Sequence, residues 1–254
     1  MKHEPDPKPP HAPRPAFPYV DGDPAPIGPG GGLAIIGACA AAFAALSLLP
    51  QWLPGAIGTW AGATAFVALQ LLGLVIAVGP AWTALFRRPR ARDLLIALAC
   101  VPLVFAVPAA VALGVVGDAH LVENEVIARS GTLPPSQLLT LFAASGLQLL
   151  GEELVTILPL LVLMAVLRRA GLGPWWVIVI GWLVTSLIFG ALHLPTYQWH
   201  WGQALLVIGS ARVVLTGVYL LTRNLWASTL AHVVNDWSFL MFALLMARMS
   251  VHGG

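Results

Sequence analysis

The sequence has little charge. Only 9% of its 254 residues are Asp, Glu, Lys or Arg, whereas 58% are apolar and the mean hydropathy is +0.84. A soluble domain carries about a quarter charged residues to keep its surface hydrated. The chain therefore predicts a membrane protein, with the lipid bilayer as part of its solvent. A formal net charge of +2, divided among short basic groups, gives no basis for a nucleic-acid partner.

Cysteine and the common catalytic motifs are also scarce. The two cysteines, Cys39 and Cys100, lie inside apolar runs, so they indicate neither a disulfide framework nor a thiolate metal site. The chain has no HExxH and no GxSxG, and no histidine follows its membrane-embedded glutamates at the spacing of a di-iron site. We expect no cofactor and no metal, although two histidines and a glutamate within the apolar runs leave a metal as a minor alternative.

The first 32 residues differ from the rest of the chain. They hold ten of the 21 prolines and show no apolar period. A segment of this composition has little to bury. We therefore expect a disordered, Pro- and Gly-rich tail over residues 1–32 and a transmembrane helical domain over residues 33–254.

Seven apolar runs follow, most of them near the length of about 20 residues that a helix needs to cross the hydrocarbon core. They lie near 33–50, 59–86, 94–117, 137–167, 174–193, 203–221 and 225–247. The pattern predicts an all-α, polytopic helix bundle with about seven spans, within a range of six to eight. The fourth run is too long for a simple span, so residues 137–147 form either a separate interfacial helix or part of a strongly tilted span.

The basic residues predict the orientation. Ten of the 13 fall on one side if the amino terminus is cytoplasmic: Lys2, Lys8, Arg14, Arg87, Arg88, Arg90, Arg92, Arg168, Arg169 and Arg223. Arg129 and Arg248 lie on the other side, and Arg212 lies inside the sixth run. We expect the carboxyl terminus to be extracytoplasmic. The compact, Ala- and Gly-rich chain indicates a bacterial plasma membrane.

Several polar residues lie within the apolar runs, where an ionisable group costs about 2.5–3.5 kcal/mol on insertion scales. They are Gln148, Glu152, Glu153, His193, Arg212, His232, Asn235 and Asp236. A lone glutamate at such a depth is as often a polar contact between helices as a functional residue. Here the polar residues come from separate spans, which favours a shared cavity.

Helical spacing places these side chains on common faces. Phe189 and His193 are four residues apart, as are His232 and Asp236. The two adjacent glutamates point about 100° apart, so one can face the interior while the other reaches a neighbouring helix. A carboxylate that activates water and imidazoles that stabilise an oxyanion are the groups that peptide hydrolysis requires.

Three motifs in this order, Glu-Glu, FxxxH, and HxxxN or HxxxD, resemble those of the CPBP family. This group of CAAX-prenyl proteases and bacteriocin-processing enzymes, also called the Abi family, comprises glutamic-type intramembrane endopeptidases. The resemblance covers about residues 137–247, the expected catalytic core. Each motif alone is weak, but three ordered motifs on membrane spans are more specific.

The resemblance implies a role for each matched residue. Glu152 would be the base that activates water, with Glu153 supporting it. His193, which closes the FxxxH motif opened by Phe189, would polarise the same water. His232 and Asp236 would form the oxyanion-stabilising end. The family is not thought to need a metal.

Two positions depart from the family pattern. The usual Glu-Glu-x-x-x-Arg has Ile157 in place of its arginine. We expect Arg212, otherwise unexplained inside its span, to supply that cation from another helix. Asp236 stands where many members have Asn, and an ionised Asp cannot donate to an oxyanion. It is therefore protonated, orients His232, or leaves the donor role to Asn235.

We thus expect an intramembrane endopeptidase that cleaves a membrane-embedded or exported protein. Two alternatives stay open. The first is a catalytically inactive member of the same fold that binds and regulates a membrane partner, which the departures at Ile157 and Asp236 favour. The second is a transporter or proton channel, since buried Glu, His and Arg also suit an ion pathway.

Overall fold

The computed structural model describes residues 16–117, 121–124, 130 and 133–252. Within these ranges, seven helical spans are long and apolar enough to cross a membrane, which confirms the predicted all-α bundle of an integral membrane protein. The long helices are α1 Pro29–Trp52, α2 Gly55–Val78, α3 Ala91–Val111, α5 Pro135–Arg169, α6 Pro174–Leu192, α7 Gly209–Thr222 and α8 Leu225–His252. Short segments extend three of the spans: η1 Gly79–Leu85 follows α2, η2 Ala112–Val116 follows α3, and η4 Gly202–Ile208 leads into α7.

Local sequence explains where the helices begin and end. Pro29 and Pro174 each stand in the first turn of a helix, where a missing N–H costs nothing. After α5, the backbone N–H groups of Gly171 and Leu172 bond to the carbonyls of Arg168 and Leu167. Gly171 has a φ of 85°, which completes a Schellman cap. The chain therefore turns sharply from α5 into α6.

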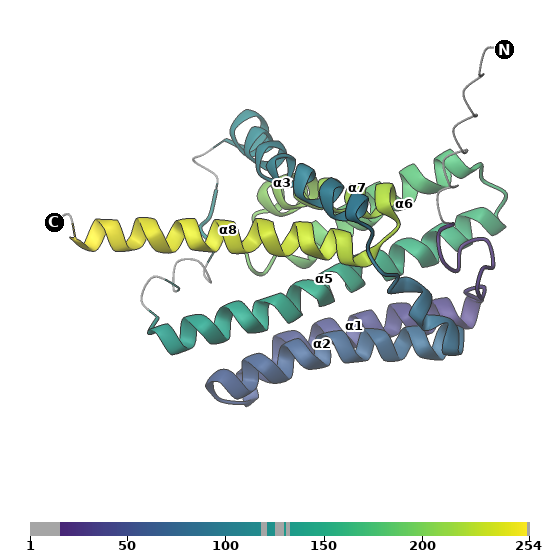
Figure 1. The fold of residues 1–254 in the computed structure, drawn as a ribbon, viewed down its shortest axis with the longest axis horizontal. Helices are drawn as coiled ribbons and strands as arrows, with labels where there is room; N and C mark the ends of the chain where they lie inside the picture. Colours follow the sequence, from purple (N-terminus) through teal and green to yellow (C-terminus); the bar gives the residue numbers. More distant parts are fainter. Residues whose placement is uncertain (1–15, 118–120, 125–129, 131–132, 253–254) are drawn as a thin grey trace, which may run out of the picture.

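Helix α5 is the centre of the bundle (Figure 1). The α1–α2 hairpin packs on one side of α5. Helices α6 and α8 also contact α5, α7 packs against both of them, and α3 packs against α7 and α8. The 35 residues of α5 form one continuous helix, so residues 137–147 are not a separate interfacial helix. At 1.5 Å per residue α5 is about 52 Å long, well beyond a hydrocarbon core of about 30 Å. The alternative of a tilted span agrees with this length.

The prediction of a disordered tail is wrong for residues 16–32. Phe17, Tyr19, Val20 and Ile27 are buried in the main hydrophobic core, and α1 already begins at Pro29. The Tyr19 hydroxyl lies 3.0 and 2.9 Å from the carbonyl oxygens of two η1 residues. Proline favours extended chain but does not prevent the residues between prolines from packing. Residues 1–15 lie outside the described ranges.

Four of the described arginines, Arg87, Arg168, Arg169 and Arg223, lie at one end of the bundle. Arg87 donates to the carbonyl of Arg223, at the turn between α7 and α8. Arg168 bonds to Asp21 at 3.0 Å, and Arg169 donates to the carbonyl of Ile27. Loops far apart in the sequence thus share one end with the N-terminal segment, as the grouping of charges predicted. Lys2, Lys8, Arg14 and Arg129 lie outside the described residues.

Candidate active site

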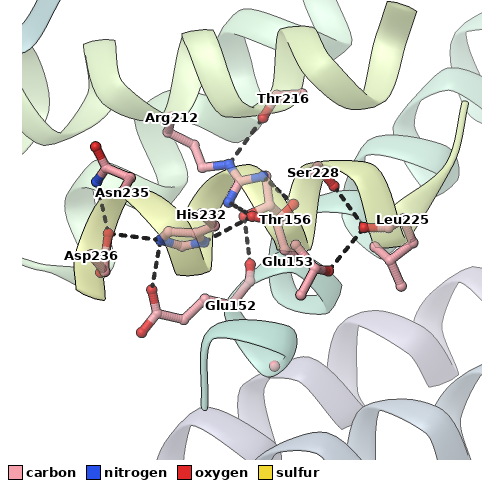
Figure 2. Close-up of polar contacts among 12 residues, drawn as sticks. Glu152, Glu153, Thr156, Arg212, Thr216, Leu225, Ser228, His232, Asn235 and Asp236 are labelled. Carbon is pink, nitrogen blue, oxygen red and sulfur yellow. Dashed lines mark hydrogen bonds and ion pairs between the residues drawn. The ribbon is translucent and has the colours of Figure 1, made fainter. Parts of the chain in front are cut away.

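The two adjacent glutamates lie at the middle of α5 and point in different directions (Figure 2). Glu153 is fully buried, whereas the Glu152 side chain is 13% exposed. This difference agrees with the predicted divergence of neighbouring helical positions. One carboxylate faces the interior of the protein and the other faces a cavity.

Glu153 forms a buried ion pair with Arg212 of α7. The two guanidinium nitrogens Nη1 and Nη2 donate to its two carboxylate oxygens at 2.6 and 2.9 Å, and neither side chain is exposed. The remaining Nε donates to Thr216 Oγ1 at 3.0 Å. Such a bidentate pair is the geometry in which a buried charge is compensated best. Arg212 therefore reaches the glutamate pair from another helix, as the sequence predicted.

Ile157 stands on α5 where the family pattern has an arginine, so α5 itself supplies no cation to Glu153 at that position. This isoleucine is fully buried one turn after Glu153, on the same face of α5. An arginine there would approach Glu153 along its own helix, but isoleucine cannot. The cation beside Glu153 is Arg212 of α7.

His232 of α8 connects the ion pair to the second glutamate. Its Nδ1 lies 2.9 Å from Glu153 Oε1, and its Nε2 lies 3.8 Å from both Glu152 Oε2 and Asp236 Oδ1. Because the carboxylate of Glu153 already accepts from Arg212, the proton of this hydrogen bond belongs to Nδ1. Glu153 therefore orients the imidazole. Of the three alternatives given for Asp236, orientation of His232 by a direct hydrogen bond is not seen, since 3.8 Å is too long for one.

Glu152 opens onto a cavity of about 190 Å³ between α1, α2, α5 and α6. Gln148, one turn earlier on α5, donates to Glu152 Oε1 at 2.9 Å. The lining residues are Phe43, Leu46, Ser47, Phe66, Gln148, Glu152, Val155, Phe189, Leu192, His193, Pro195 and Thr196. One ionisable base thus faces a space large enough for several water molecules or part of a peptide.

His193 lines the same cavity from the end of α6. Its Nδ1 lies 2.9 Å from the carbonyl oxygen of Phe189, which makes Nδ1 the donor and leaves Nε2 as the acceptor nitrogen. The Phe189 ring lies 4.5 Å from the His193 ring, 6.4 Å from the His232 ring and 5.1 Å from the guanidinium carbon of Arg212. Phe189 therefore separates the cavity from the buried ion pair.

Asn235 and Asp236 complete the far side of His232. The Asn235 amide donates to Asp236 Oδ1 at 2.8 Å, and the Asp236 side chain is 44% exposed. Asn235 keeps a second amide hydrogen for another acceptor. The structure thus brings the predicted site residues together around His232 and the neighbouring cavity.

Three contributions to this site lie outside the residues that the sequence predicts for it. The first two are Gln148, a polar residue of an apolar run, and Thr216. Each lies one helical turn from a residue that was assigned, which is a usable signal. The cavity residues of α1 and α2 gave no signal, because apolar side chains in an apolar run are indistinguishable from lipid-facing ones. Among the described residues, no group of three or more His, Cys, Asp or Glu could hold a metal ion.

A comparison with known protein families finds a match over the segment that contains these site residues. Residues 134–238 match the family model described as type II CAAX prenyl endopeptidase Rce1-like. The match confirms the resemblance to the CPBP and CAAX protease family, and it spans less than half of the chain. It includes α5, α6 and α7 and enters α8 beyond Asp236. No curated protein and no solved structure matches the chain.

Proposed function

We propose that this chain is an intramembrane endopeptidase in which Glu152 activates water to hydrolyse a peptide bond. One observation carries the proposal: a carboxylate and an imidazole, Glu152 and His193, face one cavity beside an imidazole that a buried ion pair orients. The match of residues 134–238 to a family of endopeptidases supports the same reaction class.

The residues around the cavity suit each step of the reaction. Glu152 takes a proton from a water molecule, which attacks the scissile carbonyl carbon, while His193 polarises that water through Nε2. The carbonyl oxygen becomes an oxyanion that accepts a hydrogen bond from the neighbouring His232, whose Nε2 carries a proton when the imidazole is charged and Nδ1 donates to Glu153. Collapse of the tetrahedral intermediate breaks the C–N bond, and the proton held by Glu152 passes to the leaving amine. The products are one carboxylate and one amine.

The Glu153–Arg212 pair supports this chemistry indirectly. Its Glu153 oxygen holds Nδ1 of His232, so that Nε2 points toward Glu152 and Asp236. Preorganised groups stabilise a developing charge without having to reorient during the reaction. The pair also weakens the case for a catalytically inactive relative, because Arg212 compensates for the isoleucine at position 157.

The proposed topology indicates on which side of the membrane the substrate lies. With the basic end cytoplasmic, Glu152 lies 17 residues before Arg169, which is about 26 Å along the axis of the tilted helix. His193 lies at the opposite end of α6 from Pro174. We therefore propose a site in the outer half of a bacterial plasma membrane, which suits membrane-embedded or exported protein substrates.

A comparison of processed protein termini tests the proposal. Membranes and secreted fractions from cells with the wild-type protein or with Glu152→Gln are profiled by mass spectrometry. Glu123→Gln is the matched control, since Glu123 is exposed in the described segment 121–124. We expect a set of termini that Glu152→Gln abolishes and Glu123→Gln retains. Identical profiles from equally abundant proteins would reject the enzyme and favour a regulatory binding protein.

A further inference from the structure

The cavity has a wall that lies outside the segment matched to the peptidase family. Phe43, Leu46 and Ser47 of α1 and Phe66 of α2 all line it. Leu46 and Ser47 lie three and four positions after Phe43, so both lie next to it on the helix surface. We call these four residues the hairpin wall. The glutamate and histidine that face the same cavity belong to the matched segment.

The α1–α2 hairpin is held in a defined position beside the catalytic glutamate. Gln70 of α2 is fully buried and donates to the carbonyl oxygen of Gly151 at 3.1 Å. Gly151 directly precedes Glu152, and a β-carbon at Gly151 would overlap the ring of Phe66. A buried amide bond and a close approach at glycine thus place Phe66 against α5 at the level of Glu152. The hairpin wall is therefore part of the site and more than a lipid-facing surface.

The size of the cavity limits what can occupy it. An apolar cavity of about 150 Å³ accommodates one benzene molecule, whereas drug-sized ligands occupy about 300–1,000 Å³. At about 190 Å³, this cavity is slightly larger than one that holds benzene and has room for one apolar side chain. Six apolar side chains line it: Phe43, Leu46, Phe66, Val155, Phe189 and Leu192.

We propose that the hairpin wall forms the pocket for one apolar side chain of the substrate, next to the bond that is cut. The reason is the shared cavity: a side chain seated against Phe43, Leu46 and Phe66 brings its neighbouring peptide group to Glu152 and His193. The hairpin, outside the matched segment, then selects which bonds are cleaved. This inference rests on the proposed endopeptidase function.

Two variants with opposite effects on pocket size test the inference. Leu46→Trp fills the cavity, and Phe43→Ala enlarges it. Leu48→Trp is the matched control, because Leu48 lies two residues further on α1, is 41% exposed and does not line the cavity. Detergent extraction and size-exclusion chromatography verify that all three variants fold. Termini that disappear in Glu152→Gln define the cleavage sites, and the residues flanking each cut are compared among the variants.

We expect one apolar residue beside the cut bond in the wild-type protein and in Leu48→Trp. Phe43→Ala should shift cleavage toward bulkier residues, and Leu46→Trp toward alanine and glycine. The ratio of large to small residues should change by about tenfold or more, the usual effect of a methylene in a hydrophobic pocket. An unchanged residue distribution in both pocket variants, or no apolar preference beside the cut, would overturn the inference. Absence of any Glu152-dependent terminus would overturn the proposed function itself, and this inference with it.

Discussion

Arg212 and Glu153, 59 residues apart in the sequence, form a fully buried bidentate ion pair between α7 and α5. Removing one partner of such a pair leaves an uncompensated charge, at a cost of about 3–5 kcal/mol. The pair also holds the imidazole of His232, whose Nε2 lies 3.8 Å from Glu152. It therefore links the stability of the bundle to the geometry of the site.

The first prediction concerns this pair. Arg212→Gln should destabilise the protein by about 3–5 kcal/mol and sharply reduce the cleavage that depends on Glu152. Thermal unfolding in detergent and profiling of termini measure the two effects. The double variant Glu153→Gln/Arg212→Gln should regain stability without regaining activity, because no charge is buried alone. An unaffected cleavage rate in Arg212→Gln would contradict the positioning role.

The second prediction concerns Asp236. Its carboxylate lies 3.8 Å from His232 Nε2, whereas Glu153 lies 2.9 Å from Nδ1. Asp236→Asn should therefore keep most of the cleavage activity, and Glu153→Gln should lose it. Cleavage rates of the two variants at equal expression measure the difference. If Asp236→Asn alone abolishes activity while the protein stays folded, the carboxylate of Asp236 is itself required.

The third prediction concerns the contact between α2 and α5. Alanine usually improves a helix position held by glycine, by about 1 kcal/mol. Gly151→Ala should nevertheless lower both stability and activity, because its β-carbon would overlap the Phe66 ring and overpacking costs about 1–3 kcal/mol.

The matched double variant distinguishes this steric effect from any other. Gly151→Ala combined with Phe66→Leu should recover part of the lost stability, since leucine leaves room for the new methyl group. Thermal unfolding of the wild type, both single variants and the double variant completes the cycle. Strictly additive losses would show that the two residues do not collide.

The fourth prediction concerns the N-terminal segment. Burial raises the pKa of Tyr19 to about 12 from its ordinary value of 10.0, against a smaller opposing effect of the Leu85 backbone. The neutral phenol is thus favoured in the folded protein. Its stabilising contribution is complete below pH 10 and declines as the pH rises toward 12.

Tyr19→Phe should therefore unfold at a lower temperature at neutral pH, by the equivalent of about 0.5–1.5 kcal/mol for its lost hydrogen bonding. Its stability should also fall less than that of the wild type as the pH rises above 10, because it has no phenol at position 19 to ionise. Thermal unfolding of both proteins between neutral pH and pH 12 measures this. Parallel curves over the whole pH range would show that Tyr19 does not titrate as its burial implies.

Much of the fold followed from the sequence because lipid imposes a simple rule. A helix satisfies its own backbone hydrogen bonds, so each long apolar run had to be a helical span. The same rule says nothing about the described residues that precede the first helix, because they form no helical span. Phe17, Tyr19 and Ile27 stand in a Pro-rich segment with no helical period, and their burial depends on partners in η1, α5 and α7.

The candidate site was predictable to the extent that charge is costly in a membrane. Glu152, Glu153, His193, Arg212 and His232 were conspicuous because each lies in an apolar run. Their pairing was less predictable. That Glu153 and not Asp236 orients His232 depends on the relative rotation of α5 and α8, which no spacing along one helix determines.

By itself the sequence determined that this is a seven-span helical membrane protein with costly polar residues on several spans. Hydrophobicity and helical period are local properties, and both can be seen along a single chain. Only the tertiary structure decided that Arg212 pairs with Glu153 and leaves Glu152 to face the cavity, and that the α1–α2 hairpin forms a wall of that cavity. Those relationships join side chains from separate helices, and helix packing brings them within hydrogen-bonding or van der Waals distance.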